Sequence, residues 1–490
     1  MEKRFAPISA TSFSTERAFI SRTRQPFNDK RRHATWRKLV ERLSQNGSCV
    51  IQQLSNSRAE CEQFYRFLRN KQIQLAELIQ MSCQVKAELL ADRHVLVLGD
   101  TTSYNLKSHM GRIQDGEQVG VLEDNKTPGF MCHVHLAVDA QSSNVLGLSD
   151  VLLWNRPKSQ GKSLPSYMLK VEDKETYKWF LGIENATGVL NQAAKRTFVL
   201  DRDADNYDLF SFLCAKQDDH FVIRSRHDRQ VRYQNEEQSM SSSLVQSSSL
   251  GTYTLDLPAL DHYSSTSGKR VKRQARQATL EVRAIPVQVL PPLTTGHPGG
   301  DPLTLYLVQA QEINVAANSQ DEPICWRLIT SHPVLSFEQA QLIIRFYCNR
   351  WIIEQLFRTS KSEGFDIEST ELETFQAIQG QTVMVLHAAA KVLQLVYARH
   401  NEQAQPIEEV FDQQECAVLN MLNAQLEGPT DKQKNPYPKS QTSWATWIIA
   451  RLGGWKGYTS QRPPGPITIK MGLDKFYIFL NAFQMIKASG

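Results

Sequence analysis

Apolar residues near the start of the chain recur at three- and four-residue intervals, which is the period of an amphipathic helix. The segments with this spacing are 35–43, 58–68 and 75–90. The chain is therefore predicted to begin with a helical region.

The pattern changes after residue 93. Short apolar runs bounded by polar residues predict buried strands, and stretches of helical spacing come between the later ones. The predicted strands are 94–99, 131–140, 144–154, 197–200 and 220–224, and the predicted helices are 174–193 and 207–215. Strands that are first adjacent and then alternate with helices predict an α/β core with a mixed sheet.

A β-rich insertion is predicted next, because strand-like runs occupy 252–257, 279–290 and 303–312. The Ser/Gln-rich segment 234–250 is predicted to be a mobile loop within it.

A long helix is predicted over 336–361, beginning with a capping box of Ser336 and Gln339. The chain from about 376 onward is predicted to be mostly helical. The apolar arc of the long helix, expected to face the core, comprises Leu342, Phe346, Ile353, Leu356 and Phe357.

Composition bounds the class of protein. The chain has 490 residues, 41% hydrophobic and 22% charged, which is typical of a soluble globular protein with two to four packed units. No apolar stretch approaches the length of a membrane span, and the N-terminus lacks the apolar core of a secretory signal. The eight cysteines are scattered without a C-x-x-C pair, so no disulfide framework or zinc site is indicated. We expect a cytoplasmic protein without a membrane association.

Positive charge is concentrated at the N-terminus. The net charge is +5, yet residues 1–43 hold eleven Lys and Arg against four Asp and Glu. Such an end suits DNA, although a solvated basic tail would look the same. A second basic segment contains Lys269, Arg270, Lys272, Arg273 and Arg276, and predicts either a phosphate-contacting loop or a flexible solvated one.

Two histidines, His133 and His135, lie on one face of a predicted strand. That spacing could serve a metal site, but no Cys or further His is nearby in the sequence, so ordinary packing is favoured.

Acidic residues at three places suggest metal chemistry. Asp100 and Asp201 each follow a predicted buried strand, where α/β sheets place their ligands, although turn or cap aspartates occur there too. Asp203 and Asp205 leave the second ligand ambiguous. The third acid, Glu354, lies among cations on one arc of the long helix, which predicts either a metal-binding carboxylate beside phosphate contacts or a surface stripe of ion pairs.

The tract Tyr347-x2-Arg350-x3-Glu354-x6-Lys361 matches the Y-(2)-R-(3)-E-(6)-K signature of bacterial insertion-sequence transposases of the IS-four family. Asp100-Thr-Thr-Ser and Asp201-Arg-Asp-Ala-Asp resemble that family's two catalytic aspartates. Similar patches extend over nearly the whole chain, at 28–32, 65–70, 221–227, 326–331 and 449–454.

The resemblance implies a ribonuclease H-like catalytic domain over 76–375, with a β-rich insertion at about 228–325. It also implies a helical DNA-end-binding domain over 1–75 and a helical dimerisation domain over 376–490. The implied activity is cut-and-paste transposition: nicking at the transposon ends, hairpin formation and opening, then strand transfer. Asp100, Asp201 and Glu354 would hold two Mg²⁺ or Mn²⁺ ions per site. The expected partners are double-stranded DNA, as inverted-repeat ends and as target, and a second copy of the chain in the DNA complex. Action at the nucleoid of a bacterial cytoplasm is expected.

The resemblance also implies DNA contacts. Trp326 would stack on a flipped base, with Trp351 as a second aromatic, unless these are core residues. The expected contacts with the DNA backbone are Arg31, Arg32, Arg224, Arg226, Lys269, Arg270, Lys272, Arg273, Tyr347, Arg350, Arg358 and Lys361. Gln355 and Arg358 depart from related enzymes, which carry glutamate and lysine there.

Two other functions use the same features. A non-catalytic DNA-binding or inhibitory protein would need the basic N-terminus but not the three acids. A ribonuclease H-like nuclease that cuts without joining would need the acids but not the Tyr–Arg–Lys signature.

Overall fold

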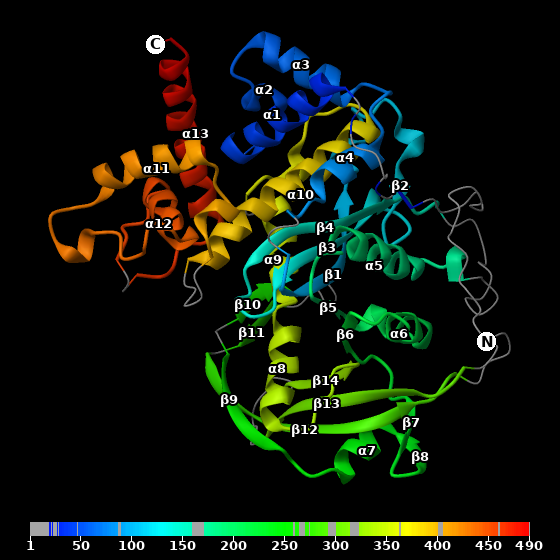
Figure 1. Cartoon of the computed structure of the whole chain (residues 1–490). Coiled ribbons are helices and arrows are strands. Elements are labelled where there is room, and N and C mark those ends of the chain that lie inside the picture. Colours follow the sequence, from blue (N-terminus) through cyan, green and yellow to red (C-terminus); the bar gives the residue numbers. More distant parts are fainter. Residues whose placement is uncertain are drawn as a thin grey trace. The chain divides into compact units, whose positions relative to one another are not determined.

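The structure is a computed structural model of the chain. It describes residues 19–20, 22, 27, 29–46, 48–86, 90–158, 171–257, 260–263, 270–273, 275–292, 300–313, 323–361, 364–399, 405–458 and 461–489. The chain divides into two compact units, which are treated separately below (Figure 1). Unit 1 comprises Met1–Ala194 with Ile352–Gly490, and unit 2 comprises Lys195–Trp351.

The sheet of unit 1 is built from antiparallel neighbours. β3 (Pro128–Asp139) pairs with β1 (His94–Asn105), β4 (Val145–Trp154) and the short β2 (Gly120–Val121). Ten successive residues of β3, Gly129–Val138, are buried, which explains its nearly continuous apolar sequence.

Helix α10 (Phe375–Ala398) is the centre of the helical part of unit 1. Most of its residues are buried, and it contacts α1, α4 and β4. A helix that is apolar on nearly every side must be covered on every side, so the N- and C-terminal helices pack around it. The helices of unit 1 besides α10 are α1 (Lys30–Asn46), α2 (Ile51–Leu54), α3 (Arg58–Leu68), α4 (Leu75–Ser82), α5 (Tyr177–Val189), α9 (Trp351–Lys361, whose first residue belongs to unit 2), α11 (Gln413–Leu426), α12 (Thr442–Leu452) and α13 (Pro466–Ser489), with short 3-10 turns η2 (Lys107–His109), η3 (Gly116–Gln118), η5 (Val171–Asp173), η7 (Ile367–Ser369), η8 (Ile407–Glu409) and η9 (Asp431–Gln433).

Unit 2 has a mixed sheet. β5 (Lys195–Leu200) and β6 (Asp219–Arg224) are parallel, as the intervening α6 (Tyr207–Cys214) requires. The remaining pairs are antiparallel and form the predicted β-rich insertion. They involve β7 (Gln230–Tyr233), β8 (Glu236–Ser239), β9 (Gly251–Leu257), β12 (Arg276–Val289), β13 (Leu303–Ile313) and β14 (Cys325–Thr330), while β10 (Leu260–Tyr263) and β11 (Arg270–Arg273) form a separate pair; η6 (Arg202–Ala204), α7 (Met240–Gln246) and α8 (Phe337–Cys348) complete the unit.

Several local predictions were wrong. The strand predicted at 94–99 continues to Asn105, because backbone pairing with β3 persists after the apolar run ends. The predicted mobile loop 234–250 contains β8 and α7, and Ser239 caps α7 by accepting a hydrogen bond from the amide of Ser242.

The predicted long helix is two helices. The amide of Arg350 bonds to the carbonyl of Tyr347, three residues back, at 3.0 Å, and this tighter turn separates α8 from α9. Ser336 caps α8 as predicted, but Gln339 accepts from the amide of Leu335 instead of completing the box. Leu342 is exposed, whereas the other four predicted core residues are buried.

Among the described residues, no helix combines the length and the apolar character that crossing a membrane requires.

Candidate active site

Asp100 lies within β1, opposite Val134 of β3, and not at the end of a strand as predicted. Burial falls at this point: Val95–Gly99 are buried, whereas Asp100 is half-buried. One oxygen of the Asp100 carboxylate accepts a hydrogen bond from the amide of Thr101 at 2.8 Å. Because side chains alternate along a strand, Asp100 and Thr102 share one face and Thr101 points to the other.

Helix α9 packs on the face of β1 that carries Asp100. The amine of Lys361 donates to the hydroxyl of Thr102 at 2.9 Å and to the carbonyl of Ser103 at 2.6 Å. Glu354 precedes Lys361 by seven residues, which is close to two helical turns, so both lie on one face of α9. Glu354 thus shares a face of α9 with Lys361, and Lys361 contacts the strand that carries Asp100.

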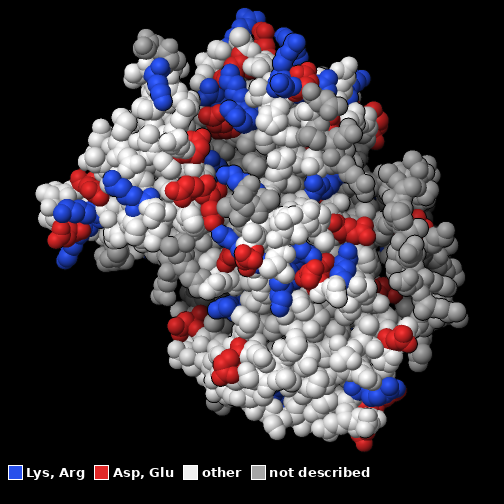
Figure 2. Space-filling model, viewed as in Figure 1, with Lys and Arg blue, Asp and Glu red and all other residues white. Residues whose placement is uncertain are grey.

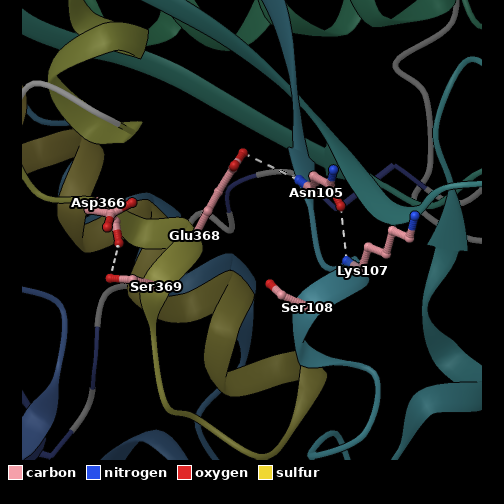
Figure 3. A pocket seen from close by; sticks show the side chains of 6 residues that line it. All are labelled: Asn105, Lys107, Ser108, Asp366, Glu368 and Ser369. Carbon is pink, nitrogen blue, oxygen red and sulfur yellow. Dashed lines mark hydrogen bonds between the residues drawn. The ribbon is translucent and has the colours of Figure 1, made fainter.

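The amine of Lys361 is largely enclosed. Burial lowers the pKa of Lys361 from its ordinary value, and the carboxylate of Glu368, 4.0 Å away, acts in the opposite direction. Glu368 also accepts a hydrogen bond from the amide of Asn105 at 3.3 Å. Figure 3 shows Glu368 directed toward Asn105. Both residues line an open pocket of about 620 Å³.

The acids after β5 have different environments. Asp205 is buried and bonds to the guanidinium of Arg229, at 2.7 and 2.9 Å, and to the amides of Arg226 and His227. These bonds occupy Asp205 in holding the chain after β6. Asp203 is exposed, and its amide donates to the half-buried carboxylate of Asp201 at 2.9 Å. Asp201 thus caps η6, as the alternative interpretation predicted, and it directly follows β5.

Trp326 and Arg224 lie on neighbouring strands of unit 2. Arg224 is opposite Leu328 in the β6–β14 pair, and Trp326 precedes Leu328 by two residues, so all three share one face. Trp326 is half-buried. The guanidinium of Arg224 donates to the carbonyl of Cys325 at 3.4 Å, next to Trp326.

The signature residues do not share one continuous helical arc, because α8 ends before Arg350. Tyr347 is buried on α8, and Arg350 lies in the turn. Trp351 begins α9 and is 58% exposed, so the core interpretation of this residue was wrong. Arg358 is exposed on α9.

Among the described residues of the basic N-terminal region, six cations lie on α1, and Figure 2 shows Lys and Arg side chains gathered over α1–α3 with acidic side chains among them. Arg31 is exposed, while Arg32 donates to the side chain of Gln72 at 2.7 Å. Residues 1–18 and Lys269 lie outside the described residues, as do the side chains of β11, which include Arg270, Lys272 and Arg273.

His133 and His135 are packed core residues, as the favoured interpretation predicted. Their rings are 4.7 Å apart and nearly perpendicular, and the ring of His133 lies 4.4 Å from that of Trp179. The Nδ1 atom of His133 lies 2.9 Å from the hydroxyl of Thr101.

Sequence reasoning missed two features of unit 1. One is the contact of Lys361 with β1, which no spacing rule reveals because it joins residues far apart in the chain. The other is Asp150, a buried carboxyl group on β4. The single acid inside the apolar run 144–154 was a signal for it.

The donor chemistry of Asp100, Asp201 and Glu354 fits Mg²⁺ or Mn²⁺, since these ions prefer carboxylate oxygens. Across the described part of the chain, no cluster of three or more His, Cys, Asp or Glu side chains is arranged to hold a metal. Within unit 1, the pair Asp100 and Glu354 has the better geometric support, through the packing of α9 on β1.

Comparison with known families gives two matches. Residues 182–390 match the family described as Transposase DDE domain, and residues 23–73 match the family described as Transposase DNA-binding. The first match includes Asp201 and Glu354 and begins after Asp100. A DDE domain implies a ribonuclease H-like core, in agreement with the mixed sheet. Together the matches support a DDE transposase that has its own DNA-binding region.

Proposed function

We propose that this chain is a cut-and-paste DNA transposase of the bacterial IS-four family, similar to the transposase of the transposon Tn-five. The observation that carries the proposal is the packing of the Asp100 face of β1 against the Glu354 face of α9, in a chain with a DDE match. Two acids 254 residues apart in sequence thereby come from surfaces in contact.

In this proposal Asp100, Asp201 and Glu354 are the catalytic acids and hold two Mg²⁺ or Mn²⁺ ions. Bound ions would supply charge stabilisation for the attacking and leaving oxygens of a phosphodiester displacement. The environments of the three acids after β5 support Asp201 as the second ligand: Asp205 is occupied by Arg229, and Asp203 is exposed.

The reaction sequence would begin with a nick that exposes a 3′ hydroxyl at the transposon end. That hydroxyl would attack the opposite strand to form a hairpin, water would open it, and the ends would join target DNA. One site can serve every step, because each is the same displacement with a different nucleophile.

Hairpin formation bends a strand sharply and requires an unstacked base. The shared face of Trp326 and Arg224 supports a role for Trp326 as the stacking platform and for Arg224 as a neighbouring phosphate contact. Trp351, Tyr347, Arg350, Arg358 and Lys361 would form the remaining contacts around the flipped base, and the exposure of Trp351 and Arg358 supports their part.

The partners would be two transposon ends, target DNA and a second copy of the chain. Arg31, Arg32, Arg226 and the basic segment with Lys269, Arg270, Lys272 and Arg273 would contact DNA phosphates. The exposed apolar side chains of α13 support dimerisation through the C-terminal helices. The site of action would be the nucleoid of a bacterial cytoplasm.

The central test uses a duplex that carries the inverted repeats bordering the gene, incubated with MgCl₂ and a target plasmid. Glu354→Gln and Asp201→Asn should lower the nicking rate by roughly a hundredfold to a thousandfold and leave duplex binding intact. Asp203→Asn is the matched control and should cut normally. Nicks, hairpins and joined products separate on a denaturing gel.

Equal cutting by wild type and Glu354→Gln would refute the assignment. A wild-type protein that binds without cutting would favour the non-catalytic alternative, and one that cuts without joining would favour the nuclease.

A further inference from the structure

Lys361 joins two elements of unit 1, α9 and β1. Its side chain is 27% exposed, and two of its three N–H donors bond to Thr102 and Ser103 of β1. Transferring an ammonium group out of water is costly unless hydrogen bonds replace its hydration. The two bonds to β1 provide that replacement. The side chain of Lys361 is therefore held in one conformation, unlike a solvated lysine at the surface.

The contacts of Lys361 lie near both acids of the proposed site. Thr102 follows Asp100 by two residues, about 7 Å along a strand. Glu354 precedes Lys361 by two turns, about 10 Å along the helix. A connection at this distance restrains the sliding and rotation of α9 relative to β1, and these are the motions that would change the separation of Asp100 and Glu354.

The C-terminal end of β1 makes a second contact, with η7. Glu368 of η7 accepts from the amide of Asn105, and Figure 3 shows its side chain extending toward that residue. Glu368 also faces the amine of Lys361 at 4.0 Å. The segment after Asp100 is thus held at Thr102, Ser103 and Asn105.

We propose that Lys361 is a positioning residue, whose amine fixes α9 against β1 and thereby sets the location of Glu354 relative to Asp100. This role rests on the proposed function, in which these two acids hold metal. It is additional to the phosphate contact proposed above for Lys361, because the two bonds to β1 use only two of the three N–H donors of the amine.

The test is a double-mutant cycle between the two sides of the contact. Lys361→Met removes the donors, and Thr102→Val removes one acceptor while keeping the β-branched shape. Both should raise the Mg²⁺ concentration for half-maximal nicking of the inverted-repeat duplex, Lys361→Met by roughly tenfold and Thr102→Val by about threefold. The double variant should need no more Mg²⁺ than Lys361→Met alone, because both changes remove one interaction.

Ser360→Ala is the matched control. The hydroxyl of Ser360 bonds to that of Tyr104 at 3.2 Å, so this variant also loses a bond between α9 and β1, but an uncharged one farther from Asp100. It should lower the melting temperature without changing the Mg²⁺ requirement. Duplex affinity, measured in EDTA, should be the same for Thr102→Val and wild type.

The proposal is overturned if Thr102→Val has a wild-type Mg²⁺ requirement. It is also overturned if the effects of the two substitutions on the Mg²⁺ requirement are fully additive in the double variant. Either result would leave Lys361 with a DNA contact alone. Failure of the proposed function looks different, since wild-type protein would then show no Mg²⁺-dependent nicking.

Discussion

Asp150 is a carboxyl group enclosed in the interior of unit 1. It lies opposite His135 in the β3–β4 pair, and neither of its oxygens has a partner with good hydrogen-bond geometry among the described residues. Burial raises the pKa of Asp150 to about 8, against smaller opposing effects of Asn185 and Arg22. The folded protein therefore binds a proton here that the unfolded chain releases above its ordinary pKa.

The sign of the resulting pH dependence follows from the raised pKa. The contribution of Asp150 to stability is complete below pH 3.8 and is lost as pH rises through about 8. Asp150→Asn should remove this dependence, so its free energy of unfolding should gain about 1–2 kcal/mol relative to wild type between pH 6.5 and 8. Urea unfolding followed by tryptophan fluorescence measures the difference. Asp431→Asn, at a fully solvated acid, should follow wild type at both pH values; an equal change in both variants would exclude Asp150 as the source.

At the scale of elements, α13 has two different sides. It buries Ile469, Leu473, Phe476, Tyr477 and Leu480 within unit 1. Its other side exposes a row of large apolar residues, several of them seven apart: Ile467, Met471, Ile478, Phe479, Met485 and Ile486. A continuous exposed row of this kind on one helix is typical of an interface with another chain.

Ile478→Asp places a charge in the middle of that row. Because Ile478 is 66% exposed, the fold should tolerate the change. A dimer interface that buries this surface should be disrupted, because it would enclose an unpaired charge. We expect the complex with the inverted-repeat duplex to change from two protein chains to one, as measured by light scattering after gel filtration. Lys475→Ala, at an exposed position of the same helix, should remain dimeric. A dimeric Ile478→Asp complex would place the interface elsewhere.

At the scale of the whole molecule, charge is distributed unevenly. The N-terminal excess of cations exceeds the net charge of the entire chain, so the remaining residues are acidic on balance. Binding to a duplex should then release counterions mainly through the N-terminal region, with a strong dependence on salt.

Arg31→Ala should weaken binding to the inverted-repeat duplex and reduce the slope of log affinity against log salt by about 1. Arg31 is exposed, so the change should leave stability unaltered. Fluorescence anisotropy at several NaCl concentrations gives the slope. Lys434→Ala removes an exposed cation near the C-terminus, paired with Asp431, and should leave the slope unchanged. If both variants retain the wild-type slope, Arg31 does not contact a phosphate.

The amino-acid sequence alone determined the order and type of most elements. Apolar periodicity is a local property, so the strands around 131–154, the helix of 207–214 and the β-rich insertion could be predicted without coordinates. The fixed spacing of Tyr347, Arg350, Glu354 and Lys361 likewise showed a resemblance to a transposase signature, since gaps along the chain can be read from the sequence. The boundaries of β1 and of α8 could not be predicted, because pairing with β3 extends the first and a single tightened turn ends the second.

Only the tertiary structure decided which polar groups serve the fold. Asp205 looked equivalent to Asp201 in sequence, and the contact with Arg229, 24 residues away, separates them. Lys361 looked like a surface cation, and its bonds to β1, about 260 residues earlier, make it part of the packing of unit 1. Such contacts join distant parts of the chain, and their free energies depend on burial and on donors that only the folded arrangement brings within reach.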